Sequence, residues 1–305
     1  MLKTVLRRFL PLLLLPLLAV GCEERADGRL KAVWGRRGIS DGRFNKPRAM
    51  AIDRDDHLYI VDMTARIQVF ATDGRFLRGW QTPDHKFGKP TGLSIARDGT
   101  VWVADTHYYR VLVYSPEGKL LKTFGGKQGE RPGEFGLVTS VAHDSAGNFY
   151  VSEYGEYDRI QKFTPEGKFL LQWGGHGSKP GQFIRPQKMV FDEQDHLWVT
   201  DSCNHRLQVF DTNGKLLHVW GKEGSRPGQL CYPYDIALAG DSLYVCEYEN
   251  HRVQKFTRDG RSLGCFGVQG RRDGQFFNPW ALVRDSRGTI YVLDTGNNRV
   301  QVVKM

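Results

Sequence analysis

Six segments of the chain place an acidic residue four to six residues before an arginine. A carboxylate and a guanidinium so placed can bind a charged substrate, or they can hold backbone in position. A catalytic centre needs one such pair, whereas a repeated architecture needs one in every unit. We therefore expect the pairs to be structural, with each acid accepting hydrogen bonds from a neighbouring loop. They are Asp62/Arg66, Asp105/Arg110, Glu153/Arg159, Asp201/Arg206, Glu247/Arg252 and Asp294/Arg299.

The elements that position these pairs recur along the chain. Successive acids are 43, 48, 48, 46 and 47 residues apart. In each unit an apolar pair of strands precedes the acid, and a two-residue turn such as Asp73-Gly74 follows the arginine strand, as is typical of hairpins. Four short strands repeated at this spacing predict a β-propeller, because one such sheet cannot bury both of its faces alone.

The two ends of the chain complete each other. The sixth unit stops at Met305 after its third strand, and residues 29–34 match the missing outer strand. We expect an all-β, six-bladed propeller of four-stranded antiparallel blades over residues 29–305. Its amino-terminal strand would complete the last blade and remove an exposed sheet edge.

Three segments carry a more specific resemblance. NHRLQVF, NHRVQKF and NNRVQVV in units four to six are similar to the NHL repeat, and the similarity extends over residues 29–305. The resemblance implies a six-bladed propeller of a kind used mostly to bind proteins, peptides, nucleic acid or glycans. A few members of that family are enzymes.

The first 21 residues have the pattern of an export signal, with cations followed by an apolar run too short to cross a bilayer. The run ends LAVGC, which resembles the lipobox of bacterial lipoproteins. We expect a signal peptide at 1–21 and a lipid-anchored tether at 22–28, with Cys22 lipidated. The protein would then lie in the cell envelope, on the periplasmic or cell-surface side of a bacterial membrane, with its hairpin turns toward that membrane.

A proline, or Val138 in the third unit, recurs before the acid of each unit, and the residue directly after it differs from unit to unit, as expected where a ligand is bound. These residues should ring the mouth of the axial channel. One residue further, Lys188 and Asp235 stand in adjacent units and can form an ion pair in the channel. We predict that these two residues and the ring contact a ligand. The ring comprises Arg48, Thr91, Thr139, Gln187, Tyr234 and Trp280.

Charge and composition restrict the class of protein and the kinds of partner that it can bind. With 40% hydrophobic, 25% charged and 12% aromatic residues the chain is neither disordered nor a multi-span membrane protein. The formal net charge is +9, and the connections between blades hold fourteen Lys or Arg against six acids. A basic face favours an anionic partner. We expect a monomeric propeller that binds a protein, a peptide or an anionic envelope polymer, and export disfavours nucleic acid.

The sequence has no nucleophile elbow, no phosphate-binding glycine loop and no closely spaced His/Cys cluster, so no cofactor, metal or catalytic residue is predicted. The amidating lyases, which are propellers of this repeat type, bind zinc through histidines directly after the repeat proline, and the ring residues here include no histidine. Two alternatives stay open: a lyase or hydrolase acting through Lys188, Asp235 and nearby Tyr or His, and a structural part of an envelope complex.

Assigning Cys22 to the lipid leaves four cysteines. Cys203 and Cys231 should meet on the loops between blades four and five, and an oxidising compartment allows them to form a disulfide. Cys246 and Cys265 lie in strands and are expected to be buried thiols.

Overall fold

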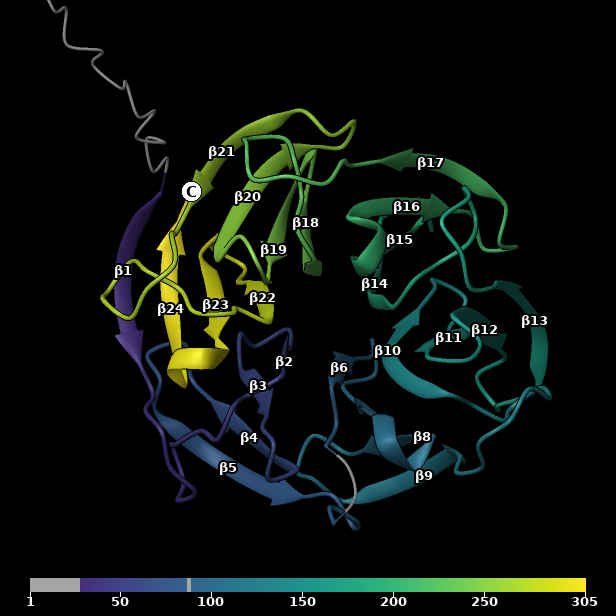
Figure 1. Ribbon diagram of the computed structural model, residues 1–305. Helices are drawn as coiled ribbons and strands as arrows, with labels where there is room; N and C mark the ends of the chain where they lie inside the picture. Colours follow the sequence, from purple (N-terminus) through teal and green to yellow (C-terminus); the bar gives the residue numbers. More distant parts are fainter. Residues whose placement is uncertain (1–27, 87–88) are drawn as a thin grey trace, which may run out of the picture.

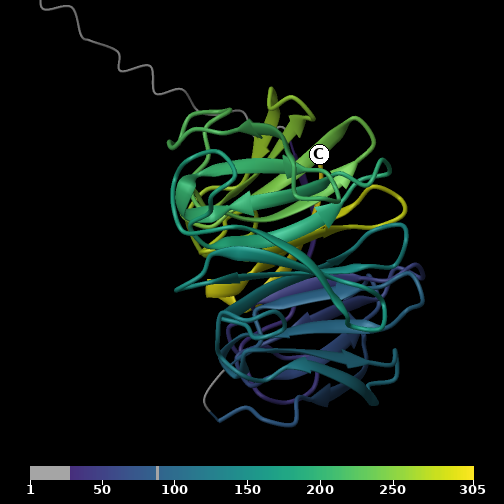
Figure 2. The same cartoon turned by 90° about the vertical axis from the view of Figure 1, so that its right-hand side faces the viewer.

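Six four-stranded antiparallel sheets are arranged in a ring around a central axis (Figure 1). The computed structural model describes residues 28–86 and 89–305. Seen edge-on, the ring is a disc of stacked blades (Figure 2). Within the described residues the only helical segments are three short 3₁₀ turns, and no helix there is long and apolar enough to cross a membrane. The predicted all-β propeller with six blades is confirmed.

Each blade runs from an inner to an outer strand in chain order. Blade 1 comprises β2 (Ala49–Ile52), β3 (Leu58–Val61), β4 (Arg66–Phe70) and β5 (Phe76–Gln81). Blade 2 comprises β6 (Gly92–Ile95), β7 (Val101–Asp105), β8 (Arg110–Tyr114) and β9 (Leu120–Gly125). Blade 3 comprises β10 (Leu137–His143), β11 (Phe149–Tyr154), β12 (Arg159–Phe163) and β13 (Phe169–Gly174).

The second half of the chain repeats this order. Blade 4 comprises β14 (Pro186–Phe191), β15 (Leu197–Asp201), β16 (Arg206–Phe210) and β17 (Leu216–Trp220). Blade 5 comprises β18 (Pro233–Ala239), β19 (Ser242–Glu247), β20 (Arg252–Thr257) and β21 (Ser262–Phe266). Blade 6 comprises β22 (Ala281–Arg284), β23 (Ile290–Asp294), β24 (Arg299–Lys304) and β1 (Arg29–Trp34). The 3₁₀ turns are η1 (Thr106–Tyr108), η2 (Ser202–Asn204) and η3 (Thr295–Asn297).

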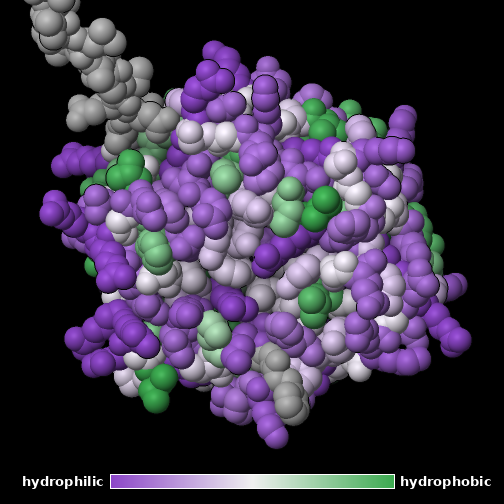
Figure 3. All heavy atoms as spheres, in the orientation of Figure 1, coloured by the Kyte–Doolittle hydropathy of each residue, from purple (hydrophilic) through white to green (hydrophobic). Residues whose placement is uncertain are grey.

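The hydrophobic core lies between neighbouring blades. Met50 and Phe70 of blade 1, for example, pack in one cluster with Tyr291 and Leu293 of blade 6. The middle strands are buried along their length, because each of their faces meets an adjacent blade. The face seen in Figure 3 is mostly hydrophilic, with hydrophobic residues scattered over it. The apolar residues therefore hold the blades together.

The ring is closed by its two ends. Strand β1 pairs antiparallel with β24, with Arg29 opposite Lys304 and Trp34 opposite Val300. Figure 1 shows these strands side by side. The Lys304 ammonium donates to the carbonyl of Arg287, in the turn between β22 and β23. The predicted closure of the last blade by residues 29–34 is confirmed.

The acid–arginine pairs join each blade to the connection that enters it. In blade 4 the Asp201 carboxylate, 0% exposed, accepts the Ile184 backbone N–H at 2.9 Å and the Arg206 Nε–H at 2.8 Å. Arg206 also donates to the carbonyls of Ser178 and Gln182. Burial raises the pKa of Asp201, and the hydrogen bonds oppose that rise.

The same set of hydrogen bonds between acid, arginine and connection recurs around the ring. Asp62, Glu153, Glu247 and Asp294 likewise accept one backbone N–H from a connection and bind the arginine of their own blade. Asp105 binds Arg110 at 2.8 Å. The predicted structural role of these pairs follows from their geometry.

Candidate functional site

The two faces of the disc differ in what they carry. One face, here called the loop face, bears the connections between blades and the segments η1, η2 and η3 after the acids. The other, the turn face, bears the turns between first and second strands of each blade. The inner strands β2, β6, β10, β14, β18 and β22 run between the faces around the axis (Figure 1).

An aromatic cluster stands at the loop-face mouth of the axis. Tyr234, the second residue of β18, stacks on Tyr248 with ring centroids 4.6 Å apart. Trp280, which directly precedes β22, meets Tyr234 edge-on at 4.9 Å. The Arg48 guanidinium lies over the Trp280 ring, 5.2 Å from its centroid. Three of the predicted ring residues, from blades 1, 5 and 6, are therefore in one group.

A second guanidinium completes this group. Arg185, which directly precedes β14, lies 5.0 Å from the ring centroid of Tyr154 and 5.2 Å from that of Tyr234. Gln187, another predicted ring residue, accepts the Arg185 Nε–H at 3.2 Å and so orients it. We call Arg48, Tyr154, Arg185, Tyr234, Tyr248 and Trp280 the mouth cluster.

The mouth cluster carries two cations, Arg48 and Arg185. In the described part of the chain, neither the Arg48 nor the Arg185 guanidinium has a carboxylate partner, and both residues are half-buried; Asp158 accepts only the backbone N–H of Arg185, at 2.7 Å. Burial lowers the pKa of Arg48, and the nearby charge of Arg185 lowers it further. Burial and Arg48 likewise lower the pKa of His107, which favours the neutral imidazole. Burial raises the pKa of Tyr234 to about 12, so its phenol stays protonated.

The remaining two ring residues are committed to the scaffold. The Thr91 hydroxyl lies 2.7 Å from the Thr106 hydroxyl. The Thr139 hydroxyl lies 2.8 Å from that of Ser152 and donates to the carbonyl of Pro186. These side chains are 8% and 1% exposed, and a ligand contact at Thr91 or Thr139 stays a prediction.

Lys188 and Asp235 do form the expected ion pair, with Nζ and Oδ1 3.6 Å apart. Asp235 is buried, and its oxygens also accept the backbone N–H groups of Ile236 at 2.8 Å and Leu282 at 3.3 Å. Burial raises the pKa of Asp235 to about 6, against the opposing charge of Lys188. Lys188 and Asp235 follow the ring residues Gln187 and Tyr234 by one position in the sequence. Lys188 lines a separate axial cavity, whose lining also includes residues of the turn face.

Two histidines near the mouth have structural partners. His205 Nδ1 accepts the backbone N–H of Tyr232 at 3.1 Å, and His251 Nδ1 accepts that of Asn278 at 3.0 Å. Their equivalent contacts, 27 residues along the chain in each case, confirm that they belong to the repeat.

The cysteines divide as expected in burial. Cys246 and Cys265 are 0% and 6% exposed, so the predicted burial is confirmed. Cys203 and Cys231 are half-buried free thiols, and burial raises the pKa of each. The Cys203 thiol, burial and the Cys231 thiol raise the pKa of Tyr232. Their pairing stays a prediction, and Cys22 lies outside the described residues.

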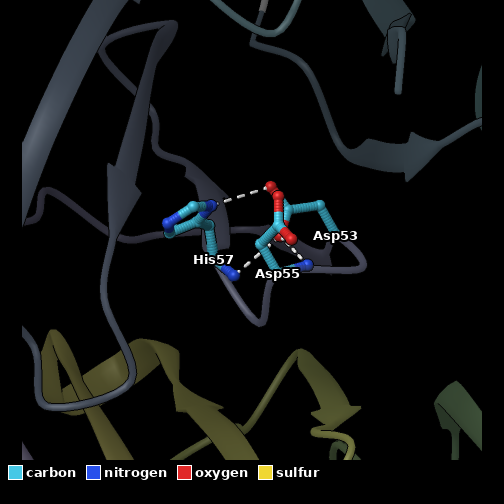
Figure 4. A group of neighbouring side chains, drawn as sticks. All are labelled: Asp53, Asp55 and His57. Carbon is cyan, nitrogen blue, oxygen red and sulfur yellow. Dashed lines mark hydrogen bonds and ion pairs between the residues drawn. The ribbon is translucent and has the colours of Figure 1, made fainter. Parts of the chain in front are cut away.

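One acidic group has a spacing that would suit a metal, in the turn between β2 and β3. Asp53, Asp55 and His57 lie together there (Figure 4). Asp53 accepts the backbone N–H of His57 at 2.8 Å and lies 3.1 Å from its Nδ1. Asp192 accepts the His196 backbone N–H at the same distance in blade 4, and its carboxylate lies 3.3 Å from His196 Nδ1. The recurrence identifies this group as a turn cap of the repeat.

Three of the six members of the mouth cluster, Arg48, Tyr234 and Trp280, were predicted from the sequence as ring residues. The sequence did not indicate that Arg185, Tyr154 and Tyr248 join them. A signal was available, because Arg48 and Arg185 both stand next to the start of an inner strand. Pairing them requires knowing which blades face each other across the axis.

Comparison with known proteins locates the repeat. The family model for the NHL repeat matches residues 183–210, 230–256 and 276–303, in blades 4, 5 and 6. The chain is 31% identical over 184 residues to peptidyl-glycine alpha-amidating monooxygenase of Mus musculus, a match covering 57% of this chain and 18% of that protein. It is 29% identical over 160 residues to NHL repeat-containing protein 3 of Mus musculus, covering 48% of this chain and 45% of that protein. The matches thus span less than half of these relatives.

Solved structures share the fold over most of the chain. A streptogramin B lyase superposes with a TM-score of 0.65 at 13% identity, covering 91% of this chain and 97% of that one. An auxiliary nutrient binding protein from Bacteroides ovatus superposes with a TM-score of 0.69 at 15% identity, covering 92% of this chain and 77% of that one. With these matches and the observed ring of blades, the chain is identified as a six-bladed β-propeller that carries NHL repeats.

Proposed function

We propose that the protein is a non-catalytic binding scaffold whose loop-face mouth binds a carboxylate group of its partner. The partner is a protein, a peptide or an anionic glycan. One observation carries the proposal: the mouth cluster holds two half-buried guanidiniums against aromatic rings, and no carboxylate of the described residues neutralises either of them.

An incoming anion can form favourable hydrogen bonds and ion pairs with these two guanidiniums. A guanidinium binds a carboxylate through two parallel hydrogen bonds, and a partly desolvated site strengthens that interaction relative to water. The hydroxyls of Tyr154, Tyr234 and Tyr248 make no hydrogen bond to another residue in the described ranges, so they are available as donors. The aromatic faces offer a surface for a sugar ring or an apolar side chain beside the carboxylate. The similarity to a nutrient-binding structure agrees with a binding role.

The test is a calorimetric titration of the full chain with two carboxylate probes, trigalacturonate and a Glu-rich peptide. Because each variant removes one of two charge-assisted contacts, Arg48→Met and Arg185→Met should each weaken binding about tenfold, or about 1.4 kcal/mol. Arg271→Met, on an exposed loop-face connection, is the matched control and should bind as the parent does. Failure of both probes to bind, or equal affinity of all three variants, would refute the proposal.

We also propose, from the sequence, that Cys22 is lipidated and anchors the propeller in the cell envelope. The mature chain should start at Cys22 and carry the added mass of a lipid on that residue. Mass spectrometry of the membrane fraction measures this mass. A Cys22→Ser variant should no longer be found in the membrane fraction. A mature amino terminus at any other residue would contradict the proposal.

A further inference from the structure

A cavity of about 460 Å³ occupies the axis below the mouth cluster and includes turn-face residues. We call it the axial funnel. Its volume lies within the ~300–1,000 Å³ that is typical of ligand pockets. Residues from all six inner strands line it, and most of those along its walls are apolar. The larger apolar residues of the walls whose side chains are partly exposed are Ile52, Ile95, Val190, Phe191 and Leu238.

The inner end of the funnel is polar. Lys188 is the lining residue nearest the start of β14, and its side chain is 19% exposed. Among the described residues its ammonium has only long contacts, 3.6 Å to Asp235 Oδ1 and 3.5 Å to the carbonyl of Leu93. The Ser94 hydroxyl, which also lines the funnel, is buried and has no hydrogen-bond partner within residues 28–86 and 89–305. The Lys188 ammonium at this end is thus incompletely satisfied.

Asp235 does not fully occupy the lysine. Its carboxylate already accepts two backbone N–H groups, from Ile236 and Leu282. The Lys188 ammonium has three donors and no acceptor within 3.4 Å among the described residues. A ligand carboxylate can therefore add hydrogen bonds to Lys188 without displacing those that hold Asp235.

The carboxylates at the funnel rim are engaged elsewhere. Asp192 and Glu193 lie 3.2 and 3.3 Å from the guanidinium of Arg258. Asp195 accepts the backbone N–H of Ser145 at 2.8 Å. Arg284, exposed, lines the same rim without a carboxylate partner in the described part of the chain. An anion entering the funnel thus meets acids that already have hydrogen-bond or ion-pair partners, together with the cations Lys188 and Arg284.

From this arrangement we infer that the axial funnel is a second ligand site, which takes an amphiphile with one carboxylate head and an aliphatic body. The head lies against Lys188, and the body lies along the apolar walls. Burial of that body supplies about 25 cal/mol per Å² of apolar surface, and Lys188 supplies the preference for an anionic head. This site is separate from the mouth cluster and does not depend on it.

Calorimetry of the full chain with dodecanoate, dodecanol and dodecylammonium, each below its micelle concentration, tests the assignment. Dodecanoate should bind with 1:1 stoichiometry and at least tenfold more tightly than dodecanol, and dodecylammonium should be the weakest. Equal binding of the three, or none by dodecanoate, would overturn the assignment.

Variants locate the site. Lys188→Met should abolish the preference for dodecanoate over dodecanol and leave trigalacturonate binding at the mouth unchanged. The double variant Lys188→Met/Asp235→Asn removes both charges, so it keeps the test valid if the single variant folds poorly. Lys119→Met, which removes an exposed cation near β9, is the matched control and should keep the preference. Dodecanoate selectivity that survives in both Lys188 variants would rule out the funnel as the site.

Discussion

Replacing Arg252 by methionine is expected to lower the free energy of unfolding by about 3–5 kcal/mol, as when one partner of a buried ion pair is removed. The Arg252 side chain is 4% exposed, and its Nε–H donates to Glu247 at 2.7 Å. The same guanidinium donates to the carbonyls of Ser225, Arg226 and Gln229, in the connection that enters blade 5. The variant loses these bonds and leaves the Glu247 charge buried without its cation.

Urea denaturation at pH 7.5 measures this loss. Arg261→Met is the matched control, because Arg261 is exposed at the start of an outer strand and should change the stability by less than about 0.5 kcal/mol. Burial raises the pKa of Glu247, so the Arg252→Met variant should recover part of its stability as the pH falls and that carboxyl is protonated. If both variants unfolded at the same urea concentration, the Glu247–Arg252 pair and its hydrogen bonds to the connection would make no contribution to stability.

The second large expected effect is a pH-dependent loss of stability in the Lys188→Met variant. The folded-state pKa of Asp235 is about 6, above its ordinary value of 3.8, because of burial. The stability that this shift contributes is present below about pH 4 and is lost as the pH rises through about 6. Removing Lys188 takes away the charge that opposes the shift, so the folded-state pKa rises further. At pH 8 the variant must then either bury a carboxylate without its cation or protonate that group against the solution pH, and we expect a loss of about 3–5 kcal/mol of stability.

At pH 5 the Asp235 carboxyl is largely protonated with or without the lysine, so the two proteins should differ much less. Urea unfolding of parent and variant at both pH values makes the comparison. Lys188→Met/Asp235→Asn has no charge to titrate at this place, and its stability relative to the parent should vary less between pH 5 and pH 8. A Lys188→Met loss of the same size at both pH values would show that the lysine acts through packing alone.

Much of the fold was predictable because its signals are local. The alternation of apolar residues, the Asp-Gly type turns and the acid before each arginine all lie within a few residues of one another, and their repetition requires similar blades. The match of residues 29–34 to a missing outer strand then sets the closure of the ring. The Lys188–Asp235 pair was predictable for the same reason, because equivalent positions in adjacent repeats are adjacent in space.

The residues of the candidate sites could not be predicted in the same way, because their roles depend on side-chain partners that the repeat pattern does not specify. Thr91 and Thr139 share a repeat position with Arg48, yet their hydroxyls bond to Thr106 and Ser152 within their own blades. Such a bond depends on a partner about fifteen residues away, and the position after the proline does not encode it.

By itself, the sequence determined the number of blades, their strand order, the closure by β1 and the structural role of the acid–arginine pairs, because each follows from local pattern and its repetition. Only the tertiary structure decided that Arg48 and Arg185 share one aromatic cluster, and that Lys188 ends a funnel reaching the other face. The physical reason is that both features join side chains from blades far apart in the chain, and the curvature of the ring brings them together.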